Sequence, residues 1–146
     1  MIKFHMRVFI RHFIRNIWFF LFVKPKLIVL KMLGCKVGEN LRIYTSLANI
    51  DKAAPQNIIL GNNVTLARGV NIIAHHHYNK FLKEEFIQRD AVVEIGDDCF
   101  IGINAIILPG VKLGTGTMVG AGSIVTKSFE ERSIIAGNPA KLIRKY

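Results

Sequence analysis

Aliphatic side chains recur at every sixth position along the second half of the chain. The series runs through Ile95, Ile101, Ile107, Leu113, Val119 and Val125. A second series, four residues further along in each repeat, is mostly small: Cys99, Ala105, Val111, Thr117, Ser123 and Phe129. A period of six matches neither a helix, with about 3.6 residues per turn, nor an alternating strand, with a period of about 2. It indicates a solenoid in which three short strands close one triangular coil and the aliphatic residues stack inward from coil to coil.

The same register appears upstream, with two interruptions. Its upstream members are Val37, Ile43, Leu60, Leu66 and Ile72. The first interruption separates Ile43 from Leu60 by 17 residues, and the turn-like segment 49–57 (NIDKAAPQN) holds the excess. The second separates Ile72 from Ile95 by 23 residues, so we expect a loop over 78–92 that leaves the solenoid beside a run of three histidines. Loops that project from a rigid scaffold often carry function.

This pattern predicts an all-β chain with one main domain. We expect a parallel β-helix over 34–146, which includes the loop 78–92 and ends in a C-terminal tail over 135–146. A short helical segment over 1–33 precedes it. The 146 residues, 51% of them hydrophobic, have the size of one domain and supply enough apolar side chains for its core. Two distant cysteines without CxxC spacing argue against a zinc or disulfide framework and suit a reducing compartment.

Most of the positive charge lies near the N-terminus. The chain has a net charge of +10, and residues 1–42, with nine Lys or Arg and one acid, account for +8 of it. The first four basic residues, Lys3, Arg7, Arg11 and Arg15, recur every four residues and share one helical face. The longest apolar run, 17–23, has seven residues, whereas a membrane-spanning helix needs about 20.

Two interpretations of this basic, apolar segment stay open. Pro25 is expected to end or kink the first helix, with a second short helix over 27–33. The segment either packs on the domain or on a neighbouring subunit, or it lies in a membrane interface with basic side chains on lipid headgroups and Trp18 in the acyl boundary.

The histidines 75–77 are candidates for a metal site, a nucleic-acid contact, a packing role or a catalytic base. Adjacent residues of an extended segment point to opposite faces, so three in a row do not readily bind one ion, and we predict no metal site. The basic residues lie mainly on the apolar N-terminal segment and no nucleic-acid-binding motif is present, so we predict no nucleic-acid partner. His76 falls on the small inward series, which favours packing or hydrogen bonding for that residue.

The segment IGINAIILPGVKLGTGTMVGAGSIVTKSFEERSIIAGNPAKLIRKY (101–146) resembles the hexapeptide-repeat acyltransferases, whose fold is a left-handed parallel β-helix. The resemblance covers 34–146. The stretch GVNIIAHHHYNKF (69–81) is similar to the histidine-bearing loop of the galactoside, maltose and polysaccharide O-acetyltransferases. It departs from their pattern at Ala74, usually threonine, and at His76, usually aspartate or serine. The resemblance implies His77 as the catalytic base, with His75 as the second candidate.

The resemblance also implies a reaction and a co-substrate. An acetyl group would pass from acetyl-CoA to a hydroxyl, and an imidazole would accept the hydroxyl proton. The family pattern places the pantetheine arm against the coil backbone near Gly102, Asn104, Gly120 and Ala121. Thr126 is a further cofactor-binding position, and Lys127, Lys141 and Arg144 match basic positions near the CoA phosphates. A solvated tail is the competing interpretation of the last two. The family forms homotrimers with each active site between two subunits, so we expect a trimer.

Other functions compete with this one. Serine acetyltransferases have a similar C-terminal segment, but they usually carry a far larger N-terminal domain and lack a histidine-bearing loop at this position. A non-catalytic scaffold is a further alternative. A zinc trimer of the carbonic-anhydrase kind needs separated histidines on successive coils, whereas His5 and His12 belong to the N-terminal segment. That segment favours a sugar or lipid-linked saccharide acceptor used in surface polysaccharide synthesis, with the protein in the cytoplasm, peripheral to the inner membrane face.

Overall fold

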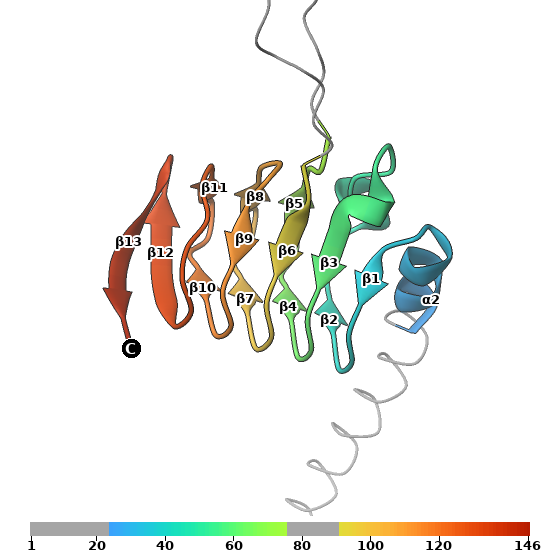
Figure 1. Cartoon of the computed structure of the whole chain (residues 1–146), viewed down its shortest axis with the longest axis horizontal. Helices are drawn as coiled ribbons and strands as arrows, with labels where there is room; N and C mark the ends of the chain where they lie inside the picture. The colour runs from blue at the N-terminus through green and yellow to red at the C-terminus, as the bar shows by residue number, and fades with distance from the viewer. Residues whose placement is uncertain (1–23, 76–90) are drawn as a thin grey trace, which may run out of the picture.

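The computed structural model describes residues 24–75 and 91–146 and shows one short helix followed by a three-faced β-solenoid (Figure 1). The first face consists of β1 (Lys36–Val37), β3 (Ile58–Leu60), β6 (Val93–Ile95) and β9 (Lys112–Leu113). The second consists of β2 (Arg42–Ile43), β4 (Thr65–Leu66), β7 (Phe100–Ile101), β10 (Met118–Val119), β12 (Ser133–Gly137) and β13 (Ala140–Lys145). The third consists of β5 (Asn71–Ile72), β8 (Ile106–Ile107) and β11 (Ile124–Val125).

The six-residue register is confirmed by the strand pairing and by burial. Neighbouring strands within each face are parallel and lie in register, except at the β12–β13 pair. All six members of the series that begins at Ile95 are no more than 2% exposed. The small series is buried as well, apart from Phe129, which packs against the core while partly exposed. Stacked aliphatic residues therefore form one continuous core along the solenoid axis.

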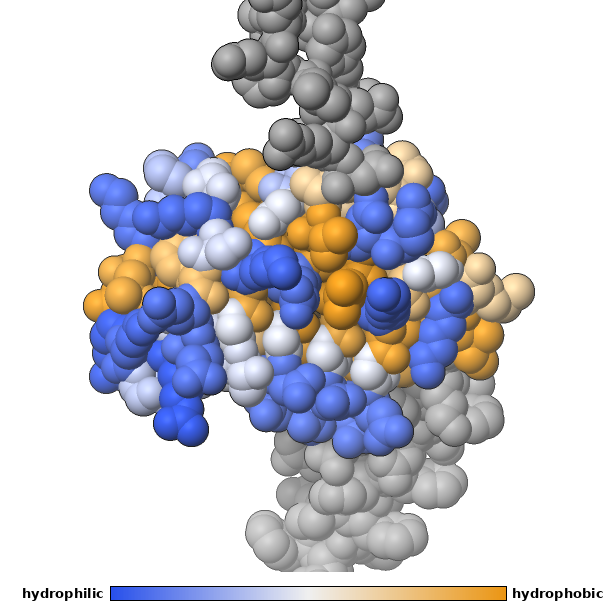
Figure 2. All heavy atoms as spheres, in the orientation of Figure 1, coloured by the Kyte–Doolittle hydropathy of each residue, from blue (hydrophilic) through white to orange (hydrophobic). Residues whose placement is uncertain are grey.

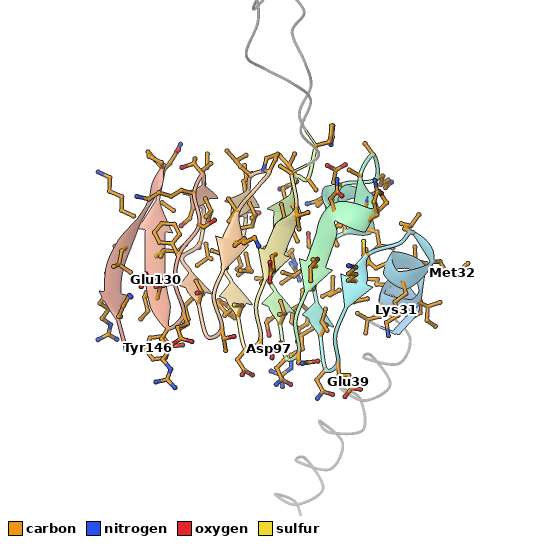
Figure 3. All side chains as sticks on the ribbon, in the orientation of Figure 1. Lys31, Met32, Glu39, Asp97, Glu130 and Tyr146 are labelled. Carbon is orange, nitrogen blue, oxygen red and sulfur yellow. The ribbon has the colours of Figure 1, made fainter. Side chains whose placement is uncertain are left out.

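Asparagine and aspartate turn the chain between the first and second faces. Asn40, Asn63 and Asp98 each have φ of +56°, a left-handed conformation that these two residue types tolerate better than other side chains do. Their preceding neighbours link the coils: the amide oxygen of Asn62 accepts the Glu39 N–H at 2.9 Å, and Asp97 accepts the Asn62 N–H at 2.7 Å. Glu39 and Asp97 lie along the same lower edge of the molecule in Figure 3. The corner is thus stabilised by side-chain-to-backbone hydrogen bonds.

The helix α2 (Lys24–Met32) closes the N-terminal end of the solenoid. It begins earlier than the predicted 27–33, because Pro25 occupies its first turn, where the missing N–H leaves no hydrogen bond unmade. Leu30, 1% exposed, covers the end of the core. The Lys26 ammonium donates to the carbonyl of Thr45 at 2.8 Å and satisfies an acceptor at the edge of the first coil. Among the described residues, no helix has the length and apolar composition needed to cross a membrane.

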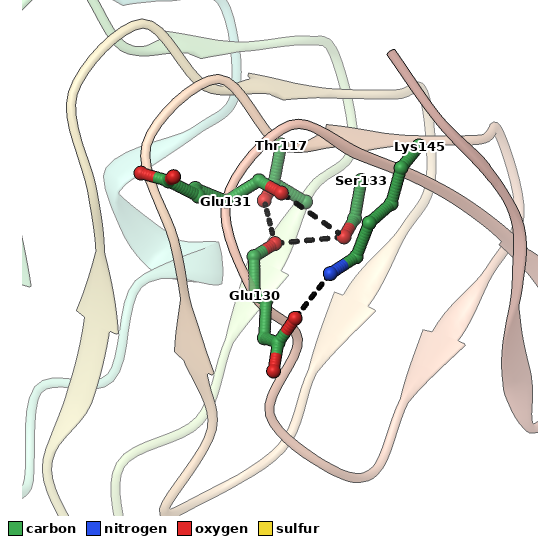
Figure 4. Close-up of polar contacts among 5 residues, drawn as sticks. All are labelled: Thr117, Glu130, Glu131, Ser133 and Lys145. Carbon is green, nitrogen blue, oxygen red and sulfur yellow. Dashed lines mark hydrogen bonds and ion pairs between the residues drawn. The ribbon is translucent and has the colours of Figure 1, made fainter.

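The predicted tail over 135–146 is in fact a β-hairpin. β12 continues the parallel stack on β10, and β13 turns back antiparallel to β12. At the base of the hairpin the Ser133 hydroxyl donates to the carbonyl of Glu130 at 2.7 Å, and the Thr117 hydroxyl lies 3.3 Å from the same carbonyl oxygen (Figure 4). The Glu130 carboxylate pairs with Lys145. The antiparallel strand β13 ends the repeat, because it occupies the edge of β12 with which a further parallel coil would pair.

Candidate functional site

His75 and Asp51 form a hydrogen-bonded pair at the point where the chain leaves the third face. His75 follows β5 in the second coil, and its Nδ1 contacts the Oδ2 of Asp51. Asp51 belongs to the first coil, where Ile50 pairs in parallel with Ile72 and the Asp51 N–H donates to the Ile72 carbonyl at 3.0 Å. The stacking of two coils therefore brings together two residues that are 24 positions apart in the sequence.

Asp51 is held by backbone donors as well as by the imidazole. Its Oδ1 accepts the Ala53 N–H at 2.8 Å, and its Oδ2 accepts the Ala74 N–H at 2.7 Å. The Asp51 side chain is 3% exposed, whereas that of His75 is 27% exposed. Burial raises the pKa of Asp51, but the hydrogen bonds from His75 and from the two backbone N–H groups outweigh it and hold that pKa below its usual range. The group is therefore a carboxylate at neutral pH.

An ionised Asp51 determines which nitrogen of the neutral His75 imidazole carries the proton. A carboxylate only accepts hydrogen bonds, so Nδ1 of His75 carries the proton and Nε2 carries the lone pair. The pair thus has the components of an oriented general base.

The pair lies at an open pocket of about 340 Å³. Both coils contribute to its wall, which consists of residues 48–53, residues 71–73 and His75. The polar lining side chains are those of Asn49, Asp51, Lys52, Asn71 and His75. A pocket that combines a half-buried base with several hydrogen-bonding groups suits a small polar ligand.

The sequence located only part of this site. His75 lies at the pocket as a candidate base, whereas His77 and His76 lie outside the described residues. Asp51 was missed, because it belongs to the turn-like excess over 49–57. One signal in the sequence could have located Asp51. Ile50 is an aliphatic residue one position out of the hexad register, and it pairs with Ile72 on the third face. This pairing places the next residue, Asp51, beside the end of β5.

The residues matched to the pantetheine arm gather at the corner between the second and third faces. Gly102 donates its N–H to the Val119 carbonyl at 2.9 Å, and a Cβ on Gly102 would lie 2.7 Å from the Ala121 nitrogen. Gly120 is crowded in the same way by the Cβ of Ala136, at 2.8 Å. Asn104 adopts φ of +56° on the exposed surface. Coil stacking by itself therefore requires both glycines, and the corner leaves Asn104 and Ala121 exposed.

Thr126 and the three basic residues matched to the CoA phosphates are exposed but divided between two parts of the chain. Thr126 and Lys127 follow β11, with the Lys127 ammonium 5.7 Å from the centroid of the Phe129 ring. Lys141 and Arg144 lie on β13, paired with Ala136 and Ile134 of β12. We call the corner that holds Gly102 and Gly120 the glycine corner. The close approach of Ala136 to Gly120 connects this corner to the Lys141 end of the hairpin.

No metal site emerges from residues 24–75 and 91–146. Within these ranges no three His, Cys, Asp or Glu side chains lie close enough together to hold an ion. Both cysteines are buried thiols, and burial raises the pKa of Cys99 to about 11.

Comparison with known proteins identifies the family. The model of the bacterial transferase hexapeptide (six repeats) matches residues 93–127. Protein CapG of Staphylococcus aureus is 38% identical over 117 residues, which are 79% of this chain and 68% of that protein. The chain belongs to the hexapeptide-repeat transferases. "Putative acetyltransferase YvoF" of Bacillus subtilis is 35% identical and covers 76% of this chain. The chain spans 60% of YvoF and 43% of a Schizosaccharomyces pombe relative, so it is shorter than the curated relatives it matches.

Solved structures share the fold. A hexapeptide-repeat acetyltransferase from Vibrio cholerae, also solved with acetyl coenzyme A, superposes with a TM-score of 0.65 at 23% identity, over 77% of this chain and 62% of that one. A maltose O-acetyltransferase from Clostridium difficile has a TM-score of 0.58 at 29% identity, over 80% and 72%. A serine acetyltransferase from Neisseria gonorrhoeae has a TM-score of 0.60 at 25% identity, over 77% and 38%. The fold is therefore the left-handed parallel β-helix that the resemblance implied.

Proposed function

We propose that the chain is an O-acetyltransferase that moves an acetyl group from acetyl-CoA to a sugar hydroxyl. The observation that carries the proposal is the Asp51–His75 pair, because it supplies an oriented base at an open polar pocket. Membership of the hexapeptide-repeat transferases supports acyl transfer. The maltose O-acetyltransferase, 29% identical, supports a sugar acceptor, and the Vibrio protein solved with acetyl coenzyme A supports the donor.

The chemistry needs one base and no covalent enzyme intermediate. Nε2 of His75 accepts the proton of the acceptor hydroxyl while its oxygen attacks the thioester carbonyl carbon. The C–S bond then breaks, the acetyl ester forms, and the proton passes from Nε2 to the thiolate, which leaves as CoA thiol. Asp51 holds the ring and stabilises the imidazolium between the two transfers. A backbone N–H is the expected donor to the oxyanion.

The geometry favours His75 as the base in this proposal. Resemblance to the family favours His77, but Asp51 orients the neighbouring His75 through Nδ1. His77 remains the alternative, and variants of both residues distinguish them.

The co-substrate is proposed to lie along the glycine corner. Gly102, Asn104, Gly120 and Ala121 would present coil backbone to the pantetheine arm. The CoA phosphates would meet the exposed side chains of Lys127, Lys141 and Arg144, with Thr126 as a further cofactor contact. The glycine corner belongs to later coils than the Asp51–His75 pair, so we propose a homotrimer in which one subunit's corner faces its neighbour's pocket.

The acceptor is proposed to be a saccharide of surface polysaccharide synthesis, free or lipid-linked, at the cytoplasmic face of the membrane. The basic, apolar character of residues 1–33 supports this setting. A serine acetyltransferase activity is the second candidate, because the Neisseria enzyme shares the fold at 25% identity.

A thiol-release assay tests the proposal. Purified protein is mixed with acetyl-CoA and a panel of sugars, with L-serine as a separate acceptor. We expect release of CoA thiol with a sugar, and loss of most of that activity in His75→Ala. Loss confined to His77→Ala would reassign the base. Release with L-serine alone would establish the second candidate, and undiminished turnover in both histidine variants would refute the mechanism.

A further inference from the structure

The helix α2 has two apolar faces, and the solenoid covers only one of them. Leu27 and Leu30 point to the core. On the opposite side, Ile28, Val29, Met32 and the following Leu33 are 58%, 37%, 82% and 44% exposed, and Pro25 is exposed as well. The positions 25, 28, 29 and 32 have the spacing of a single helical stripe. We call these five exposed residues the outer face of α2.

The outer face of α2 lies at one end of the molecule. α2 is at the opposite end of the solenoid from the β12–β13 hairpin (Figure 1), and apolar residues gather at that end in Figure 2. Met32 points away from the coils, with Lys31 beside it (Figure 3). A face directed outward along the solenoid axis can meet an extended surface.

The charge around the outer face of α2 indicates which surface. Residues 24–50 hold five Lys or Arg and one acid, a net of +4. Lys31, Lys36 and Arg42 are exposed on α2 and the first coil. A second copy would bring the same positive charge to the contact, and residues 1–23 hold four basic residues and no acid. A second copy or residues 1–23 would therefore place positive charge against positive charge. An anionic surface instead complements Lys31, Lys36 and Arg42 beside the apolar outer face.

We infer that the outer face of α2 binds an anionic lipid surface and stands the solenoid on its N-terminal end. The exposed apolar side chains enter the interface, and Lys31, Lys36 and Arg42 meet the headgroups. Lys26 takes no part, because its ammonium is bonded to carbonyls of the first coil.

This orientation has a consequence for the candidate site. Asp51 lies in the first coil from α2, and His75 follows the second. Neighbouring strands are about 4.8 Å apart, so the pocket is about one or two coil spacings from the helix. A saccharide carried on a membrane lipid then reaches the base without leaving the interface. This step, and no other part of the inference, rests on the proposed function.

Vesicle co-sedimentation tests the inference with the full chain and needs neither acetyl-CoA nor an acceptor. Protein is mixed with vesicles of phosphatidylcholine alone, or of phosphatidylcholine and phosphatidylglycerol in equal parts, at low and at high salt. We expect binding to the anionic vesicles that high salt weakens. Met32→Glu should reduce that binding about tenfold or more, because it removes an inserted apolar side chain and adds a repelled charge. Ile28→Glu combined with Met32→Glu should reduce it further.

Ile143→Glu is the matched control, because Ile143 is 63% exposed on β13 at the other end of the solenoid. It should bind as the wild type does. Equal binding of Met32→Glu and wild type would overturn the inference, as would equal losses in Met32→Glu and Ile143→Glu. A lower oligomeric mass of Met32→Glu by light scattering, with vesicle binding unchanged, would assign the face to a second copy. A change in Trp18 fluorescence without vesicles, again with unchanged binding, would assign it to residues 1–23. Thiol release is measured separately, so either claim can fail without the other.

Discussion

Replacing Asp51 with asparagine changes the hydrogen bonding at His75 while it leaves side-chain volume almost unchanged. The carboxylate accepts from the Ala53 and Ala74 N–H groups and from Nδ1 of His75. An asparagine has one acceptor oxygen, and its NH2 group donates. If the NH2 group faces His75, it favours the tautomer with the proton on Nε2, which lacks the lone pair that the reaction requires.

Activity should therefore fall much more than stability in Asp51→Asn. Loss of an oriented general base costs about 10²–10⁴-fold in kcat, which is about 3–5 kcal/mol of transition-state free energy. The fold loses one hydrogen bond to a charged acceptor, about 1.5–3 kcal/mol. A typical domain is stable by about 5–15 kcal/mol, so most of the variant stays folded. The KM for acetyl-CoA should change less than kcat, because Asp51 acts through His75 and is not one of the residues proposed to hold the cofactor.

Steady-state thiol release and urea unfolding measure the two effects on the same preparation. Asp97→Asn is the matched control, because Asp97 also accepts a backbone N–H, at 2.7 Å, in a corner without a histidine partner. It should keep its activity. Because the folded-state pKa of Asp51 is lowered, its contribution to stability is present above pH about 4 and disappears as pH falls through the folded value. The stability difference between Asp51→Asn and wild type should therefore shrink in acid.

Two results would refute this reasoning. Equal kcat values for wild type and Asp51→Asn would show that the pair does not orient the base. An equal loss of activity in Asp97→Asn would show that any disturbed corner inactivates the protein.

Two further predictions concern the solenoid. Thr117→Val removes a buried hydroxyl that donates to the Gly114 carbonyl at 2.7 Å and should lower the free energy of unfolding by about 1–3 kcal/mol, whereas Thr115→Val at an exposed neighbour should be close to neutral in the same urea titration. Equal effects would contradict the role of the Thr117 hydroxyl. Burial raises the pKa of the Cys99 thiol from 9.0 to about 11, so Cys99 should react with a thiol reagent at pH 8 only as fast as the protein opens. For the same reason, the free energy of unfolding should fall as pH rises from 9 toward 11, because the unfolded state loses the thiol proton first. Rapid labelling in native buffer would contradict its burial.

The six-residue pattern by itself predicted a parallel β-helix, whereas the left-handed sense came from the resemblance to the family. Residues such as Ile95, Ile101 and Ile107 repeat at a fixed interval, and each coil contacts its neighbours through the same positions, so a one-dimensional pattern specifies the core. The two interruptions were located for the same reason, since both break the interval. The hairpin at the C-terminal end was not predicted, because the repeat stops there and β13 is exposed along most of its length.

The site and the outer face of α2 depended on tertiary structure. Asp51 looks like one residue of a polar turn until the first coil stacks under the second and brings its carboxylate to Nδ1 of His75. Sequence spacing does not encode this contact, because the extra residues of 49–57 move Asp51 out of the hexad register. Likewise, the apolar residues of α2 could all have packed on the core. Only the docked helix shows that Leu30 is buried while Met32 points outward, because one end of a solenoid accommodates just one face of a helix.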